Sequence, residues 1–143
     1  MKIHQLSLFL ENKPGHLGNA VKLLAENNLN IATLSLADTE QFGILRLIMS
    51  EWERARQLLA GAGFVVKITE VVAIEVSDRP GGLNDILRVI GATGLNIEYM
   101  YAFSKRRGEA AILLLRFSDP DAALTALRDG GGIKLVTAAE MFG

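Results

Sequence analysis

Two stretches of this sequence carry the same short motifs, and that repeat restricts the folds open to the chain. The loop sequence Asn-Lys-Pro-Gly at residues 12–15 returns as Asp-Arg-Pro-Gly at residues 78–81, 66 positions later. Leu-Asn-Ile at residues 29–31 returns at residues 95–97 with the same offset. A unit of this length repeated once is too long for a solenoid element. The sequence therefore predicts two small, similar domains.

Each copy has the pattern of a strand, a helix, two strands, a second helix and a last strand. Leucines alternate with other residues over residues 6–10, which is the period of a strand. Apolar residues then recur at helical spacing over residues 17–24. Two helices and four strands in this order make the ferredoxin-like split βαβ arrangement. We therefore predict an α+β protein of two tandem ferredoxin-like βαββαβ domains with antiparallel sheets, at residues 1–70 and 71–143.

Local signals place the end of the first helix and the strands that follow it. Asn27 and Asn28 predict the helix end, because asparagine tolerates the left-handed conformation found there. We expect strands at residues 30–37 and 43–49, joined by a hairpin around residues 40–42.

Other signals mark the second helix of each copy. Ser50 and Glu53 have the spacing of a capping box, which predicts that Ser50 is the N-cap of this helix. In the second copy Pro120 suits the first position of the corresponding helix, and the glycines at 130–132 end it. After the Leu-Asn-Ile motif the offset between the copies rises from 66 to 68, so the second copy gains two residues, which we place near residues 105–108.

Some predicted strands carry apolar side chains on both faces. Residues 112–115 are apolar without alternation, and Tyr99, Tyr101 and Phe103 place aromatic rings on one side of a neighbouring strand. A domain of this size is marginally stable alone and would leave such a face in water. We therefore expect the two sheets to associate, and we predict a homodimer because one chain would leave apolar surface uncovered.

The composition argues against several classes of protein. The 143 residues include 15 Lys and Arg against 16 Asp and Glu, for a net charge of −1, whereas a nucleic-acid-binding surface is normally basic. The longest apolar run, residues 110–115, is far shorter than the roughly 20 residues of a membrane-spanning helix. The sequence shows no export signal and no cysteine. We expect a cytoplasmic protein with neither a nucleic-acid nor a membrane partner.

Residues suited to catalysis are sparse. His4 and His16 lie in different predicted elements, without acidic neighbours at metal-ligand spacing. No serine has the flanking glycines of a nucleophile elbow. We therefore predict that the protein is not an enzyme and uses no metal and no cofactor.

The repeated loops are the strongest candidates for a binding site. Each joins the first strand of its copy to the start of the first helix, where free N–H groups and the positive end of the helix dipole suit a carboxylate or phosphate. Proline limits the loop's freedom, and glycine lets a ligand approach the backbone. The simpler interpretation is a sharp turn in which Asn12 or Asp78 caps the helix. Likewise, Asn30 and Asn96 suit the starts of their strands for structural reasons alone.

The loop motif followed by Leu-Asn-Ile on a βαββαβ frame resembles the ACT domain in both copies, and the resemblance covers essentially the whole chain. ACT domains are small regulatory modules of amino-acid metabolism, and the resemblance implies that a free amino acid binds where two of them meet. In the serine-sensing members a histidine lies two residues before the loop asparagine, but this chain has Leu10 and Val76 there. The implied ligand-binding residues are Asn12, Lys13, Pro14, Gly15, Asn30, Ile31, Asp78, Arg79, Pro80, Gly81, Asn96 and Ile97.

Two pairings of the domains would build this site. If the two copies lie side by side, Asn12 faces Asn96 and Asp78 faces Asn30. If chains pair through like copies, Asn12 meets Asn30 of the partner chain. In both cases the loop supplies donors for the carboxylate of an amino acid, and an asparagine supplies an acceptor for its ammonium group.

Three alternatives remain open. The chain could be a regulatory subunit of a biosynthetic enzyme such as acetolactate synthase, whose small subunit carries an ACT domain. An acylphosphatase-like enzyme would share the βαββαβ order and use Arg79 and Asn96, but Lys13 of the first copy lacks the planar fork of a guanidinium. A nucleic-acid-binding protein would stack bases on Tyr99 and Tyr101, which the near-neutral charge disfavours.

Overall fold

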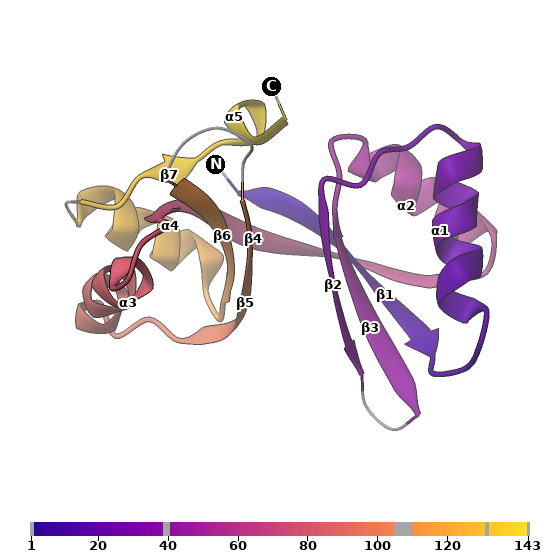
Figure 1. The fold of residues 1–143 in the computed structure, drawn as a ribbon, viewed down its shortest axis with the longest axis horizontal. Coiled ribbons are helices and arrows are strands. Elements are labelled where there is room, and N and C mark those ends of the chain that lie inside the picture. The colour runs from indigo at the N-terminus through magenta and orange to yellow at the C-terminus, as the bar shows by residue number, and fades with distance from the viewer. Residues whose placement is uncertain (1, 39–40, 105–109, 131, 143) are drawn as a thin grey trace. The chain divides into compact units, whose positions relative to one another are not determined.

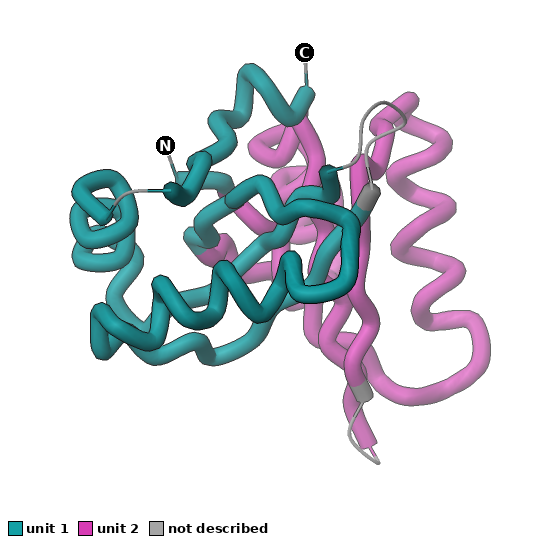
Figure 2. The backbone as a smooth tube through the Cα atoms, turned by 60° about the vertical axis from the view of Figure 1, so that its left-hand side comes forward, with its two compact units in different colours: residues 1–3, 70–143 teal, residues 4–69 magenta. Residues whose placement is uncertain are grey.

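The computed structural model describes residues 2–38, 41–104, 110–130 and 132–142. The chain forms two compact units, drawn in different colours in Figure 2. Residues 4–69 make the N-terminal unit, and residues 70–143 with residues 1–3 make the C-terminal unit. The insertion expected near 105–108, and residue 40 of the expected hairpin, lie outside the described residues.

The N-terminal unit is a four-stranded sheet with two helices on one face (Figure 1). Its elements are β1 (Ile3–Glu11), α1 (His16–Glu26), β2 (Thr33–Asp38), β3 (Phe42–Ile48), α2 (Trp52–Gly61) and the first part of β4 (Val65–Ser77). The strand order is β2-β3-β1-β4, and β3 is antiparallel to both β1 and β2. This is the order of the ferredoxin-like arrangement.

Alternation along β1 builds the core of this unit. Leu6, Leu8 and Leu10 are buried against β3 leucines and against the apolar stripes of α1 and α2. The intervening Gln5, Ser7 and Phe9 lie on the other face of the strand. The predicted strand period is confirmed.

The C-terminal unit repeats the same order. It contains the second part of β4, then α3 (Gly82–Ala92), β5 (Ile97–Ser104), β6 (Ala110–Phe117), α4 (Pro120–Asp129), β7 (Leu135–Val136) and α5 (Ala138–Phe142). The strand order is β7-β4-β6-β5, and every pair is antiparallel. The prediction of an α+β fold with βαββαβ repeats and antiparallel sheets is confirmed.

Residues 1–3 belong to the C-terminal unit for identifiable reasons. The Lys2 ammonium lies 2.7 Å from a Glu70 carboxylate oxygen and 2.9 Å from one of Asp121. Hydrogen bonds to these two carboxylates raise the pKa of Lys2 above its usual value. The side chain of Ile3 is buried as well.

The local signals are confirmed in part. Asn28 has a φ of 58°, as expected of an asparagine at a helix end. Asp119 caps α4 by accepting a 3.0 Å hydrogen bond from the Ala122 N–H, with Pro120 next in the helix. The capping box at Ser50 was wrong, because the N-cap of α2 is Glu51, one residue later, and it makes no side-chain capping bond.

Several boundaries differ from the expected ones. Strand β2 begins at Thr33 rather than at residue 30, so Asn30 lies in the connection after α1. The last strand of the second copy has only two residues, and the sequence analysis missed the helix α5 that follows it. A signal was present, because Thr137 and Glu140 form a capping box: the Glu140 N–H donates to Thr137 Oγ1 at 3.2 Å, and the Thr137 N–H donates to Glu140 Oε1 at 3.3 Å. Residues 112–115 are all buried, as their unbroken apolar character predicts. No described helix is long and apolar enough to cross a membrane.

Candidate functional site

The loop after β1 turns sharply into α1. The Asn12 N–H donates to the Gln41 carbonyl at 2.9 Å, and the Lys13 N–H donates to the Glu11 carbonyl at 2.8 Å. Gly15 then adopts a φ of 87°, which costs little only for a residue without a Cβ. The Pro-Gly pair therefore brings the chain directly to the first turn of the helix.

The helices after the two repeated loops begin without a side-chain cap. Gly15 is the N-cap of α1 and Gly81 the N-cap of α3, and neither helix has a side-chain capping bond from that position. Helix α4 differs, since Asp119 caps it. The first N–H groups of a helix have no intrahelical partner, and the dipole makes that end positive. The starts of α1 and α3 therefore suit an external anion such as a carboxylate.

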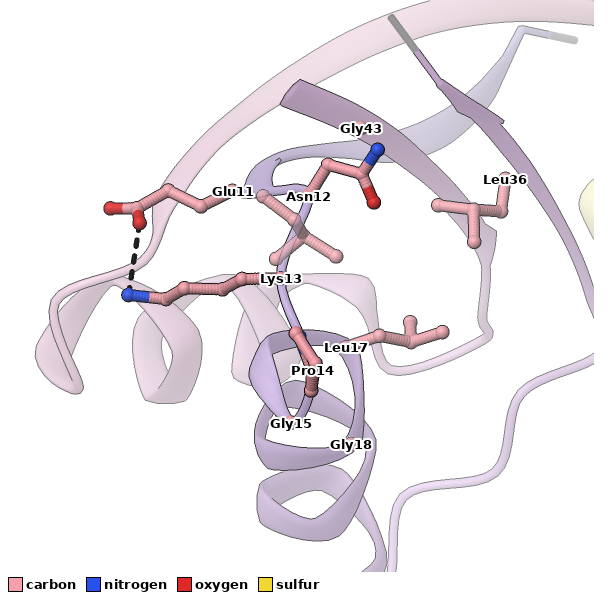
Figure 3. Close-up of a pocket in the computed structure, with 10 residues that line it drawn as sticks. Glu11, Asn12, Lys13, Pro14, Gly15, Leu17, Gly18, Leu36 and Gly43 are labelled. Atoms are coloured by element: carbon pink, nitrogen blue, oxygen red, sulfur yellow. Dashed lines mark ion pairs between the residues drawn. The ribbon is translucent and has the colours of Figure 1, made fainter. Parts of the chain in front are cut away.

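A cavity of about 760 Å³ opens beside the first loop. In Figure 3 the side chains of Asn12, Leu17 and Leu36 converge on this space from the loop, from α1 and from β2. The cavity thus combines an amide, apolar walls and a helix N-terminus. Its lining residues are Leu10, Glu11, Asn12, Lys13, Pro14, Gly15, Leu17, Gly18, Leu36 and Gly43.

The two charged lining residues bind each other. The Lys13 ammonium lies 2.9 Å from a Glu11 carboxylate oxygen, and both side chains point away from Asn12 and Leu36 (Figure 3). The hydrogen bond from Lys13 lowers the pKa of the Glu11 carboxyl below its usual value. The space in front of Asn12 is therefore lined by an amide and by apolar groups.

His16 serves the loop structurally. The Glu11 N–H donates to His16 Nδ1 at 2.8 Å, and the imidazole stacks on Phe64 with 5.5 Å between ring centroids. This ties the end of β1 to the start of α1. Among the described residues, no group of three or more His, Cys, Asp or Glu could hold a metal ion.

The second loop has different contacts. The Arg79 guanidinium lies 3.0 Å from an Asp85 carboxylate oxygen in the first turn of α3 and also donates to the Pro80 carbonyl. Gly81 has a φ of 85°, like Gly15. Asp78 is exposed. The basic residue of this loop is thus folded onto its own helix, whereas Lys13 pairs with the end of the preceding strand.

The asparagines near the second strands lie apart from the loops. Asn30 is exposed and follows α1, whose 11 residues span about 16 Å, so it lies at the opposite end of that helix from Asn12. Asn96 donates its amide to Ser118 Oγ at 3.1 Å. Ile31 and Ile97 pack partly against the two cores. Of the residues expected at the site, the cavity brings together Asn12, Lys13, Pro14 and Gly15, and it excludes Asn30 and Ile31.

The predicted site did not include six of the lining residues, namely Leu10, Glu11, Leu17, Gly18, Leu36 and Gly43. For Gly18, Leu36 and Gly43 a signal was present, because the second copy has a residue of different size at the equivalent position. Strand pairing shows that Ala111 and Ala102 of the second copy are equivalent to Gly43 and Leu36 of the first. The repeat offset of 66 residues makes Asn84 the equivalent of Gly18.

Comparisons with known proteins agree with this architecture. The family model described as an ACT domain pair matches residues 1–129. Protein BT0572 from Bacteroides thetaiotaomicron is 37% identical, over 99% of this chain and 96% of that one, with a TM-score of 0.91. The search of curated proteins found no match.

Two more distant structures share the fold. The ligand-free regulatory subunit of aspartate kinase from Thermus thermophilus is 17% identical, over 92% of this chain and 95% of that one, with a TM-score of 0.63. The corresponding subunit from Thermus flavus is 16% identical over the same shares, with a TM-score of 0.61.

Proposed function

The chain belongs to the ACT domain pair family, and we propose that it is a non-catalytic regulatory protein that binds a free amino acid. The observation that carries this proposal is the cavity at the first loop, where an uncapped helix start, the Asn12 amide and apolar walls meet. An amino acid needs donors for its carboxylate, acceptors for its ammonium and a place for its side chain.

The proposed contacts follow from these groups. The N–H groups at the start of α1 would bind the α-carboxylate, and the carbonyl oxygen of the Asn12 amide would accept from the α-ammonium. Asn30 lies at the far end of α1, so a single domain cannot offer it to the same ligand. We therefore place the site at an ACT–ACT interface, where a neighbouring domain supplies the remaining acceptors.

A second copy of the chain would cover an exposed apolar stripe next to the cavity. The stripe consists of Leu17 and Val21 on α1 with Leu34 and Leu36 on β2, an edge strand; Leu34 and Leu36 are each 50% exposed. A bare, apolar sheet edge is prone to pair with another chain. Leu17 and Leu36 also line the cavity, so a homodimer formed here would complete the site.

Leu34→Lys should convert the dimer to a monomer. Half of this side chain is already in water, so the fold should tolerate lysine, whereas a dimer interface would have to desolvate the ammonium group. Analytical ultracentrifugation at micromolar concentration measures the difference. Val65→Lys, at an exposed valine outside the stripe, should remain dimeric. A monomeric wild-type protein would contradict the proposal.

A thermal-shift screen against the twenty amino acids tests the function. A ligand that binds only the folded state raises the melting temperature. Asn12→Ala should then weaken that ligand's binding by about 1–3 kcal/mol in calorimetry, because a polar ligand group loses its partner. Asn19→Ala, at an exposed position on α1 outside the cavity lining, should bind normally. If no amino acid shifts the melting temperature at millimolar concentration, the proposed function is wrong.

A further inference from the structure

We infer that the cavity at the first loop takes an amino acid with an apolar side chain, and that Gly18 limits the size of that side chain. The inference rests on the proposed function and adds the ligand class. It also assigns a ligand of this class to the first copy only, so that each chain binds one molecule.

The walls of the cavity favour an apolar group. Leu10 lines the cavity from the end of β1 and is buried. Leu17 and Leu36 present their side chains to the space (Figure 3). Lys13 and Glu11 neutralise each other and point away. A charged ligand side chain would lose its hydration here without meeting a counter-ion, which is unfavourable. An apolar side chain would move from water into contact with the leucine side chains, which is favourable.

Glycine at two positions keeps the cavity open. A Cβ added to Gly18 would meet no atom within 4 Å, so a larger side chain there would extend into free space at the cavity wall. A Cβ on Gly43 would lie 3.5 Å from the end of the Leu36 side chain, which also lines the cavity. A larger side chain at position 18 would therefore occupy space that the ligand needs, and it would leave the fold undisturbed.

The second copy differs at three of these lining positions. Asn84 replaces Gly18, Ala102 replaces Leu36 and Ala111 replaces Gly43. The second copy thus has alanine in place of the leucine side chain of Leu36. It also has the amide side chain of Asn84 where Gly18 leaves open space. The same ligand would find less apolar surface and less room there.

Calorimetry with five probes tests the inference: L-valine, L-leucine, L-phenylalanine, L-lysine and L-aspartate. At least one apolar probe should bind with one molecule per chain, and the charged probes should bind at least about tenfold more weakly. Gly18→Asn, which introduces the residue of the second copy, should weaken the apolar probe by about tenfold or more. Gly91→Asn is the matched control, because Gly91 is also helical with open space around its Cβ position, and it should bind normally.

Gly18→Ala keeps the test valid if the asparagine variant folds poorly, because alanine favours the helix. It should weaken L-phenylalanine more than L-valine. Tighter binding of a charged probe, two apolar molecules per chain, or unchanged affinity in both Gly18 variants would overturn the inference and leave the proposed function standing. If none of the twenty amino acids binds, the proposed function itself fails.

Discussion

Phe117→Ala is expected to lower the free energy of unfolding by about 3–5 kcal/mol. Phe117 ends β6, is 0% exposed and packs among the apolar residues of β4, α3 and α4 in the C-terminal unit. Truncation to alanine removes most of its buried area and leaves a cavity that close-packed neighbours fill only in part. Urea denaturation followed by circular dichroism measures the change.

Phe42→Ala provides the control for the loss of a phenylalanine. Phe42 is 52% exposed at the start of β3, so the same truncation should cost about 1 kcal/mol or less. Equal losses in the two variants would contradict the described core of the C-terminal unit.

Gly82→Ala should destabilise the protein by about 3 kcal/mol, at the upper end of the usual cost of overpacking. Gly82 is the first residue of α3 and is buried, and an added Cβ would overlap the Ser77 carbonyl oxygen at the end of β4. The backbone sets the position of the Cβ, and the Ser77 oxygen is itself a backbone atom, so no side-chain rotation relieves the clash. The start of α3 would have to move away from the strand.

Gly91→Ala in the same helix provides the matched comparison. A Cβ there meets no atom within 4 Å, so alanine should stabilise the helix by about 0.5–1 kcal/mol through its higher propensity. Thermal denaturation of the two variants should shift in opposite directions. A Gly82→Ala protein as stable as the wild type would show that α3 does not need this close approach to β4.

Gly82 also shows how the two loops diverged. Its counterpart at the repeat offset is His16, whose Nδ1 accepts the Glu11 N–H. In the first copy a side chain thus connects strand and helix, and in the second copy direct backbone contact does so. The motif residues on both sides of this position are similar, so the motif alone does not reveal the difference.

The architecture could be predicted from the sequence because the patterns that indicate it are local or repeated. Leu6, Leu8 and Leu10 show their strand through the two-residue period of side chains, and Asp119 with Pro120 marks a helix start within two residues. The repeat then allowed each half to be compared with the other. The misplaced start of α2 at Ser50 shows the limit, since a capping pattern of four residues does not require the capping bonds to form.

The candidate site likewise has a part that local sequence patterns predict and a part that they do not. The sequence by itself determined the loop of Asn12, Pro14 and Gly15, because a strand, a Pro-Gly break and a helix start are neighbours along the chain. Only the tertiary structure decided that Leu36 and Gly43, from β2 and β3, line one cavity together with Gly18 of α1. The physical reason is that strand pairing and helix packing bring together residues far apart in the chain, and no local pattern records which side chains will share a wall.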